Sequence, residues 1–299
     1  MFMPLQRGFE LEPQTFFIID YARHFQAFSA SHRRLVRLAD THQKWLVLHL
    51  VATLAREQSD RHGRPGSTIC GLTERIGELR LASRNTAMGF LGQLVAYGWL
   101  DRHACASDNR MKLVCPSRRL VAAMDDWLDT VILGLAAERA SLRGIGLGYP
   151  EVARALLALR AYREPPPQLR QLFAMRGGWL LMNDIIAQLK PVVFGAGPFV
   201  VEGFSAGQCA QRLGLSRTTV YRFIHAAAEA GVMSMSRERG AGLAVEAAGL
   251  RAYQGWLLVL RRAMTAGLGD SAPQISAVEH SAPQVDHSGA VRGPAICVG

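Results

Sequence analysis

Lysine is nearly absent from this sequence of 299 residues, in which Lys44, Lys112 and Lys190 are the only three among 34 basic residues. The net charge of +10 therefore comes from arginine, whose guanidinium group suits bidentate contacts to phosphate and guanine better than an ammonium group does. Residues 266–299 contribute −2, which leaves +12 on residues 1–265. This charge predicts a polyanionic partner, and a general bias towards arginine is the alternative explanation.

Long hydrophobic runs are missing as well. The longest, residues 45–55 and 131–137, fall well short of the roughly 18 residues that a membrane-spanning helix needs. The start of the chain has no basic segment followed by an apolar one, which is the pattern of a secretory signal. We therefore expect a soluble, cytoplasmic protein without a membrane partner.

Cysteine is scarce, and its pattern argues against metal sites and disulfides. No two cysteines form a CxxC pair, and none lies at ligand spacing from a histidine; the five are Cys70, Cys105, Cys115, Cys209 and Cys297. We expect small buried side chains and no cofactor. A redox role for Cys105, with its thiolate stabilised by Arg102 or His103, is the alternative.

Catalytic motifs are not found either. The sequence contains no nucleophile elbow and no HExxH or paired-carboxylate motif, and Asp125-Asp126 falls on an amphipathic helix. The glycine-rich residues 144–150 follow no clear strand and lack the GK[ST] ending of a phosphate loop. His49 lies in an apolar run, so we expect a hydrogen-bonded core residue and not a ligand. These observations predict a protein that is not an enzyme.

An internal repeat organises the chain. The segment SRNTAMGF at residues 83–90 returns 133 residues later as SRTTVYRF, and Gly98 returns as Gly231 at the same offset. The segment that begins at Trp45 returns at Trp179, and Trp127 returns as Trp256. Ordered landmarks over this length predict a duplication.

Both copies predict the same order of elements: a buried helix, a loop or short strand, a second helix, and a tight turn into a third helix. The ranges before the turn are 42–57, 63–71 and 72–79 in the first copy, and 178–190, 195–203 and 206–213 in the second. Ser83 and Ser216 are expected to cap the N-terminus of the third helix. A short hairpin follows, over 101–103 and 111–114 with a turn at 107–109, and over 234–236 and 243–245 with a tip at 237–240.

The third helix of the second copy has an apolar and a polar face. Its inward positions at helical spacing are Val220, Ile224 and Ala227/Ala228. Its outward positions are Arg217, Thr218, Tyr221 and Arg222. Polar and guanidinium groups at the N-terminal end of an exposed helix are what direct readout in a DNA major groove requires. An ordinary amphipathic helix with a solvated face is the alternative.

The sequence resembles the MarR family of winged helix-turn-helix regulators. The resemblance rests on LGLSRTTV at residues 213–220 and on Asp108-Asn109-Arg110, which is similar to the Asp-x-Arg motif of the family's wing. It implies a mainly α fold with small β-hairpin wings, and it implies DNA-binding residues in the recognition helices and wings. These are Ser83, Arg84, Asn85, Thr86, Met88, Arg110, Lys112, Ser216, Arg217, Thr218, Thr219, Tyr221, Arg222, Arg237 and Arg239.

Two departures from that family shape the expected architecture. MarR-like proteins are usually homodimers of single units, whereas this chain carries two units, and its second hairpin lacks the Asp-x-Arg pattern. We therefore expect tandem winged helix-turn-helix domains that form a pseudo-dimer. Gly89 and Gly92 in the first recognition helix each lower helix stability by about 1 kcal/mol relative to alanine. This predicts that the first recognition helix binds DNA more weakly than the second.

Long apolar helices around these units are expected to join them. Residues 16–38 and 117–143 should pack against residues 150–160 and 250–264. The predicted divisions are a first unit with flanking helices at 1–143, a hinge at 144–149, a second unit at 150–265 and a disordered tail at 266–299.

Three functions fit this arrangement. The favoured one is sequence-specific binding of double-stranded DNA and transcription regulation, with a small-molecule effector, polymerase or other transcription factors as further partners, by a monomeric pseudo-dimer or a homodimer. The second is a tandem winged-helix replication initiator. The third is a winged-helix scaffold that binds protein, which the basic recognition helices and arginine-bearing hairpins argue against.

Overall fold

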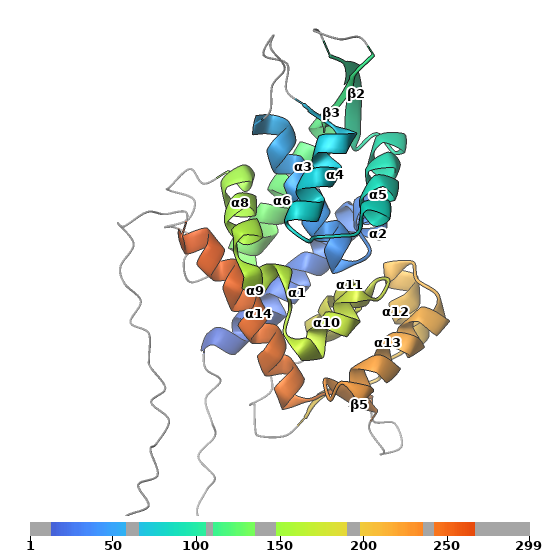
Figure 1. Ribbon diagram of the computed structural model, residues 1–299. Coiled ribbons are helices and arrows are strands. Elements are labelled where there is room, and N and C mark those ends of the chain that lie inside the picture. The colour runs from blue at the N-terminus through green and yellow to red at the C-terminus, as the bar shows by residue number, and fades with distance from the viewer. Residues whose placement is uncertain are drawn as a thin grey trace, which may run out of the picture.

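The chain is mainly helical and carries two small antiparallel sheets of three strands each (Figure 1). The computed structural model describes residues 13–57, 66–105, 110–134, 148–189, 198–235 and 242–266. The coarse fold class expected from the sequence, mainly α with small β-hairpins, is confirmed. Over the described ranges, no helix combines the length and the apolar character needed to cross a lipid bilayer.

The first half builds one of the two sheets. Its elements are α1 (Pro13–Ser31), α2 (Arg33–Leu38), α3 (His42–Glu57), β1 (Ser67–Thr68), α4 (Ile69–Glu78), α5 (Arg84–Ala96), β2 (Leu100–Ala104), β3 (Lys112–Pro116) and α6 (Arg118–Gly134). β3 lies in the middle and pairs antiparallel with both β1 and β2. In this register Val114 lies opposite both Ser67 and Arg102.

The second half repeats this order from its fourth helix onwards. Its elements are α8 (Tyr149–Ala158), α9 (Arg160–Arg163), α10 (Pro167–Ala174), α11 (Gly178–Ala187), β4 (Phe199–Val201), α12 (Ala206–Leu213), α13 (Arg217–Glu229), β5 (Met233–Met235), β6 (Leu243–Val245) and α14 (Ala247–Ala266). The strand order β4-β6-β5 again places the last strand in the middle. The series α11 to α14 therefore matches the series α3 to α6, element by element.

The same backbone hydrogen bonds close the two series. After α5, Trp99 N donates to Leu94 O at 2.8 Å, and after α13, Val232 N donates to Ala227 O at 2.8 Å. The glycine just before each donor, Gly98 or Gly231, has a positive φ of 68° or 66°. A left-handed residue at this place ends a helix while satisfying its last carbonyls, and glycine adopts it without strain. Each recognition-helix candidate thus turns into its hairpin in the same way.

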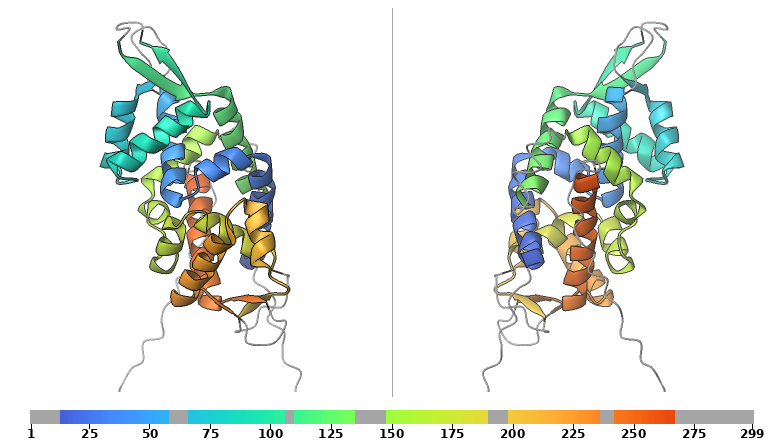
Figure 2. Two further views of the ribbon diagram at one scale, coloured as in Figure 1. Left: turned by 90° about the vertical axis from the view of Figure 1, so that its right-hand side faces the viewer. Right: turned by 90° about the vertical axis from the view of Figure 1, so that its left-hand side faces the viewer.

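One hydrophobic core runs through both halves. Helix α1 packs against α6 and α11, and α8 packs in the corresponding manner against α14 and α3 (Figures 1 and 2). Trp45 of α3 and Trp179 of α11, which are equivalent in the repeat, face each other with ring centroids 4.8 Å apart. Reciprocal contacts of this kind are typical of the interface of a two-fold dimer, and here they lie within one chain.

Histidine and tyrosine side chains are buried at this junction. His49 Nδ1 is hydrogen-bonded to Tyr149 Oη at 2.5 Å, and its Nε2 to Tyr162 Oη at 3.2 Å. Burial lowers the pKa of His49 to about 3, with a smaller effect from His42, and raises the pKa of Tyr149 well above its usual value. The expectation that His49 is a hydrogen-bonded core residue is confirmed.

The N-terminal helix differs from the expectation. Residues 16–38 do not form one helix, because α1 ends at Ser31 and α2 starts at Arg33. The intervening His32 has φ −110° and ψ 34°, and its ring bonds Asp126 of α6 at 2.8 Å. The break turns Leu35 and Val36 into the core, a tertiary requirement that helical periodicity does not contain.

Several expected segments fall at the edges of the described residues. Tyr149, which the sequence assigned to a hinge, is the first residue of α8 and is buried. Residues 135–147 and 267–299, which hold most of the predicted hinge and tail, lie outside the described residues. The two hairpin turns at 107–109 and 237–240 lie outside them as well.

Candidate nucleic-acid interface

The helices α5 and α13 start in the same way. Thr86 N donates to Ser83 Oγ at 3.3 Å, and Thr219 N donates to Ser216 Oγ at 3.1 Å. In each pair the serine and threonine hydroxyls are also 2.9 Å apart. Because a capping serine satisfies an otherwise unpaired backbone N–H, it determines where the helix begins. The predicted N-caps are confirmed in both copies.

The outer face of α13 is polar and accessible. Arg217, Thr218, Tyr221 and Arg222 are all exposed, while Thr219 is half-buried. The buried face consists of Val220, Phe223, Ile224 and Ala227. The sequence predicted three of these four positions; it missed Phe223, and Ala228 is exposed. The exposed hydroxyl, phenol and guanidinium groups stand at the capped end of the helix, where they can form hydrogen bonds with base edges or phosphates.

Room for Arg217 is provided by a glycine of the neighbouring helix. A Cβ built on Gly207 of α12 would lie 3.3 Å from Arg217 Nε, so the guanidinium packs directly over this backbone. Among the described residues Arg217 forms no ion pair with a carboxylate. Its charge is therefore available to an external anion.

A buried carboxylate anchors α12 to the rest of the molecule. Arg212 of α12 makes two bonds to Asp184 of α11, Nε to Oδ1 at 3.0 Å and Nη2 to Oδ2 at 2.7 Å. Gln26 of α1 donates to Asp184 Oδ1 at 2.8 Å, and Gln188 Nε2 donates to Oδ2 at 3.1 Å. The bonds to Asp184 raise the pKa of Arg212. This network ties the helix that precedes α13 to the N-terminal half of the chain.

The outer face of α5 has a different electrostatic character. Arg84, Asn85, Thr86 and Met88 are exposed. However, Arg84 and Met88 share a cavity of about 640 Å³ with two carboxylates of α4, which are Glu74 and Glu78. Helix α12, the counterpart of α4, contains no acidic residue. The surface around α5 is therefore less favourable to a polyanion than the surface around α13, because only α5 has carboxylates of the preceding helix beside it.

Glycines also mark α5 as the weaker surface. Gly89 and Gly92 lie on the exposed face of α5, and a Cβ added to either would meet no atom within 4 Å. Neither glycine is required by packing, so both only reduce helix stability. The helix thereby lacks side chains at two positions from which α13 extends Arg222 and His225.

The hairpin residues are described only in part. Arg110 and Lys112 of the first hairpin are exposed. Lys112 is the first residue of β3, and Arg110 lies two residues before it. Arg237 and Arg239 lie outside the described residues. In the same first hairpin, burial and the charge of Asp101 raise the pKa of the Cys115 thiol, and Cys105 is buried. A raised thiol pKa disfavours a reactive thiolate at Cys115.

The remaining observations concern metal binding, the cysteines and the comparison with known proteins. Within the described ranges no group of three or more His, Cys, Asp or Glu side chains gathers to hold a metal ion. Cys70 is exposed, which differs from the expectation of buried cysteines, whereas Cys209 is buried. No family model, curated protein or solved structure matches the chain.

Proposed function

We propose that this protein binds double-stranded DNA sequence-specifically and regulates transcription, with α5 and α13 as the recognition helices of two winged helix-turn-helix units. The observation that carries the proposal is the repeated unit itself. Two copies of the series helix, strand, helix, helix, strand, strand share sheet order, serine caps and helix-ending glycines. A capped, polar, exposed helix followed by a hairpin is the arrangement that enters a major groove in this class of DNA-binding proteins.

The reciprocal packing supports a pseudo-dimer. Helices α1 and α8 each pack against the other half's first repeated helix, and the equivalent Trp45 and Trp179 meet at the centre. DNA-binding proteins with two-fold symmetry place their recognition helices about one turn of the DNA helix apart, roughly 34 Å, in successive major grooves. One chain would then cover what two subunits of a homodimer cover.

Unequal recognition helices predict an asymmetric site. The second unit offers Arg217, Thr218 and Tyr221, and its α12 is free of acidic side chains. The first unit offers Arg84 and Asn85 near Glu74 and Glu78. The half-site read by α13 should therefore contribute more of the specificity.

The first test is selection from random duplexes by the full chain, followed by anisotropy on the selected site. Arg217→Ala should lose about 1 to 3 kcal/mol of specific binding, while binding to random duplex changes little, because base contacts specify and phosphate contacts position. Arg251→Ala, which removes an exposed arginine from α14, is the matched control. Equal losses on selected and random duplexes would show that Arg217 only contacts the backbone.

Stoichiometry tests the pseudo-dimer separately. Light scattering should give one chain on a selected duplex of about 20 base pairs. Two chains on a palindrome, with only one helix of each protecting bases, would contradict it. A replication initiator, the second candidate, would instead protect an array of repeated sites.

A further inference from the structure

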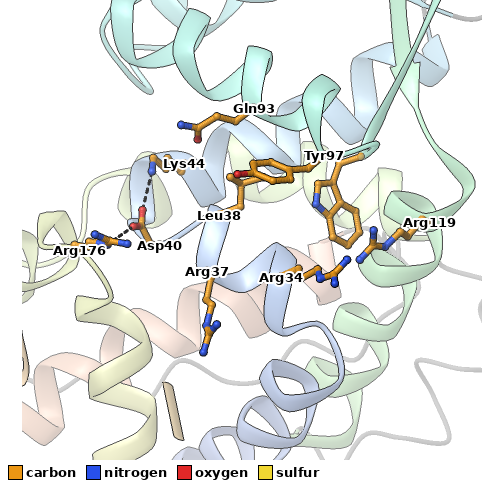
Figure 3. A pocket seen from close by; sticks show the side chains of 10 residues that line it. Arg34, Arg37, Leu38, Asp40, Lys44, Gln93, Tyr97, Arg119 and Arg176 are labelled. Atoms are coloured by element: carbon orange, nitrogen blue, oxygen red, sulfur yellow. Dashed lines mark hydrogen bonds and ion pairs between the residues drawn. The ribbon is translucent and has the colours of Figure 1, made fainter. Parts of the chain in front are cut away.

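A cleft of about 680 Å³ opens between the two halves and reaches the C-terminal part of α5, and none of the predicted DNA-binding residues lines it (Figure 3). It is bounded by α2, α3, the C-terminal part of α5, the start of α6 and the turn between α10 and α11. The residues that line it are Arg34, Arg37, Leu38, Asp40, Lys44, Gln93, Tyr97, Trp99, Arg119 and Arg176. None of its four arginines was predicted to be functional from the sequence.

The charges in this cleft are unbalanced. Asp40 is its one carboxylate, and it is already bound by Lys44 at 2.8 Å and Arg176 at 3.1 Å. Among the described residues, Arg34, Arg37 and Arg119 form no ion pair. Side chains of equal charge that gather without a carboxylate are stabilised when an anion binds between them.

Two of the guanidinium groups converge. Figure 3 shows Arg34 of α2 and Arg119 of α6 pointing toward each other. Arg119 is held over the Trp99 ring, with its Cζ 3.9 Å from the ring centroid. Stacking on an indole fixes the plane of a guanidinium and leaves its N–H donors directed sideways, in the geometry that fits two phosphate oxygens.

The cleft connects the two recognition helices. At one end, Gln93 belongs to α5 and Tyr97 is the residue that follows its last residue, Ala96. At the other end, the guanidinium of Arg37 packs against Gly214, two residues before the Ser216 cap of α13. Figure 1 shows α2 between α5 and α12, and the left-hand view of Figure 2 looks onto the side where these helices lie. The arginines therefore form a basic band from the end of one recognition helix to the start of the other.

Arg34, Arg37 and Arg119 of the cleft come from the first half. At the offset of 134 that relates Trp45 to Trp179, the residues equivalent to Arg34 and Arg37 are Gln168 and Gln171. At the offset of 133 that relates Gly98 to Gly231, the residue equivalent to Tyr97 is Ala230. At these three positions the second half therefore carries uncharged side chains.

We propose that Arg34, Arg37 and Arg119 bind DNA backbone phosphates between the two half-sites, on the side of the half-site read by the first unit. This inference rests on the proposed function and deepens it by adding a third, central contact. Arginine pairs bidentately with phosphate, and each neutralised phosphate releases counterions. These contacts to DNA phosphates add to the weak binding of the first unit's recognition helix, and the second unit does not need them.

The test compares two double variants of the full chain that lose the same charge. Arg34→Gln/Arg37→Gln introduces the glutamines of the second half into the cleft. Arg118→Gln/Arg251→Gln removes two exposed arginines that do not line it. The cleft variant should flatten the slope of log Kd against log salt by about 2, and the control by much less. Phosphate-ethylation interference should disappear at central positions on one side of the site for the cleft variant only.

Other outcomes overturn the inference in distinguishable ways. If the chain selects no duplex and binds none, the proposed function fails and the inference fails with it. If the wild-type chain binds its site and the cleft variant keeps both slope and central interference, only the inference fails. Saturable binding of AMP or pyrophosphate to the DNA-free chain, lost in the cleft variant while the salt slope is unchanged, would instead assign the cleft to a small phosphorylated ligand.

Discussion

Removal of Arg212 should destabilise the protein more than removal of its partner's charge. In Arg212→Met, the Asp184 carboxylate remains 98% buried, and its remaining donors are the amides of Gln26 and Gln188 and the thiol of Cys209. Breaking a buried pair so that one charge stays uncompensated typically costs about 3 to 5 kcal/mol. Because the Arg212 side chain is 42% exposed, part of the pair's energy is screened by water, and the lower end of this range, about 3 kcal/mol, is expected.

Asp184→Asn leaves the opposite situation. The surviving guanidinium of Arg212 can turn to water through its exposed fraction, so the cost should be about 1 to 2 kcal/mol. Arg75→Met is the matched control, because Arg75 and Glu78 form an ion pair of the same length, 2.7 Å, between two exposed side chains. Exposed pairs contribute about 0 to 1 kcal/mol.

Urea unfolding of the three variants measures these differences, and thermal melts check them. A loss of about 3 kcal/mol corresponds to a fall in Tm of about 6 to 12 °C for a chain of this size. The reasoning is refuted if Arg212→Met costs no more than Arg75→Met. It is also refuted if Asp184→Asn costs as much as Arg212→Met, since burial of the surviving charge would then not decide the energy.

Further predictions concern α5, the central histidine and the turn before α13. Gly89→Ala/Gly92→Ala should stabilise the protein by about 2 kcal/mol in urea unfolding, because both positions are open and helical; unchanged stability would contradict this. The pKa of His49 is lowered to about 3, so its contribution to stability is complete above pH 6.5 and is lost as pH falls towards 3. Between pH 7 and pH 5 the wild type should therefore lose about 2 kcal/mol more than His49→Asn, and parallel pH profiles would contradict it. Gly214→Ala should cost about the same as Gly203→Ala in the same assay, about 1 kcal/mol, because both have positive φ and the added Cβ at Gly214 meets only the flexible end of Arg37; a clearly larger cost at Gly214 would show that the Arg37 guanidinium cannot move aside.

Local features of the fold were predictable from the sequence. Ser83 and Ser216 cap helices because a serine hydroxyl accepts from a nearby backbone N–H wherever the chain turns into a helix. The two strand pairs of the hairpins and the outward face of α13 follow from periodicity and turn chemistry in the same way. The repeat of Trp45 at Trp179 indicated two related halves, though not that these rings would touch.

Contacts between residues far apart in the chain were decided by the tertiary structure. The break at His32 depends on Asp126 of another helix, and the anchoring of α12 depends on Asp184, 28 residues from Arg212. The arginine cleft likewise brings residues 34, 119 and 176 together. A sequence pattern reports which face of an element is apolar, because that depends on neighbours three or four residues away. It does not report which faces meet, since that depends on how all the apolar surfaces of both halves are buried at once.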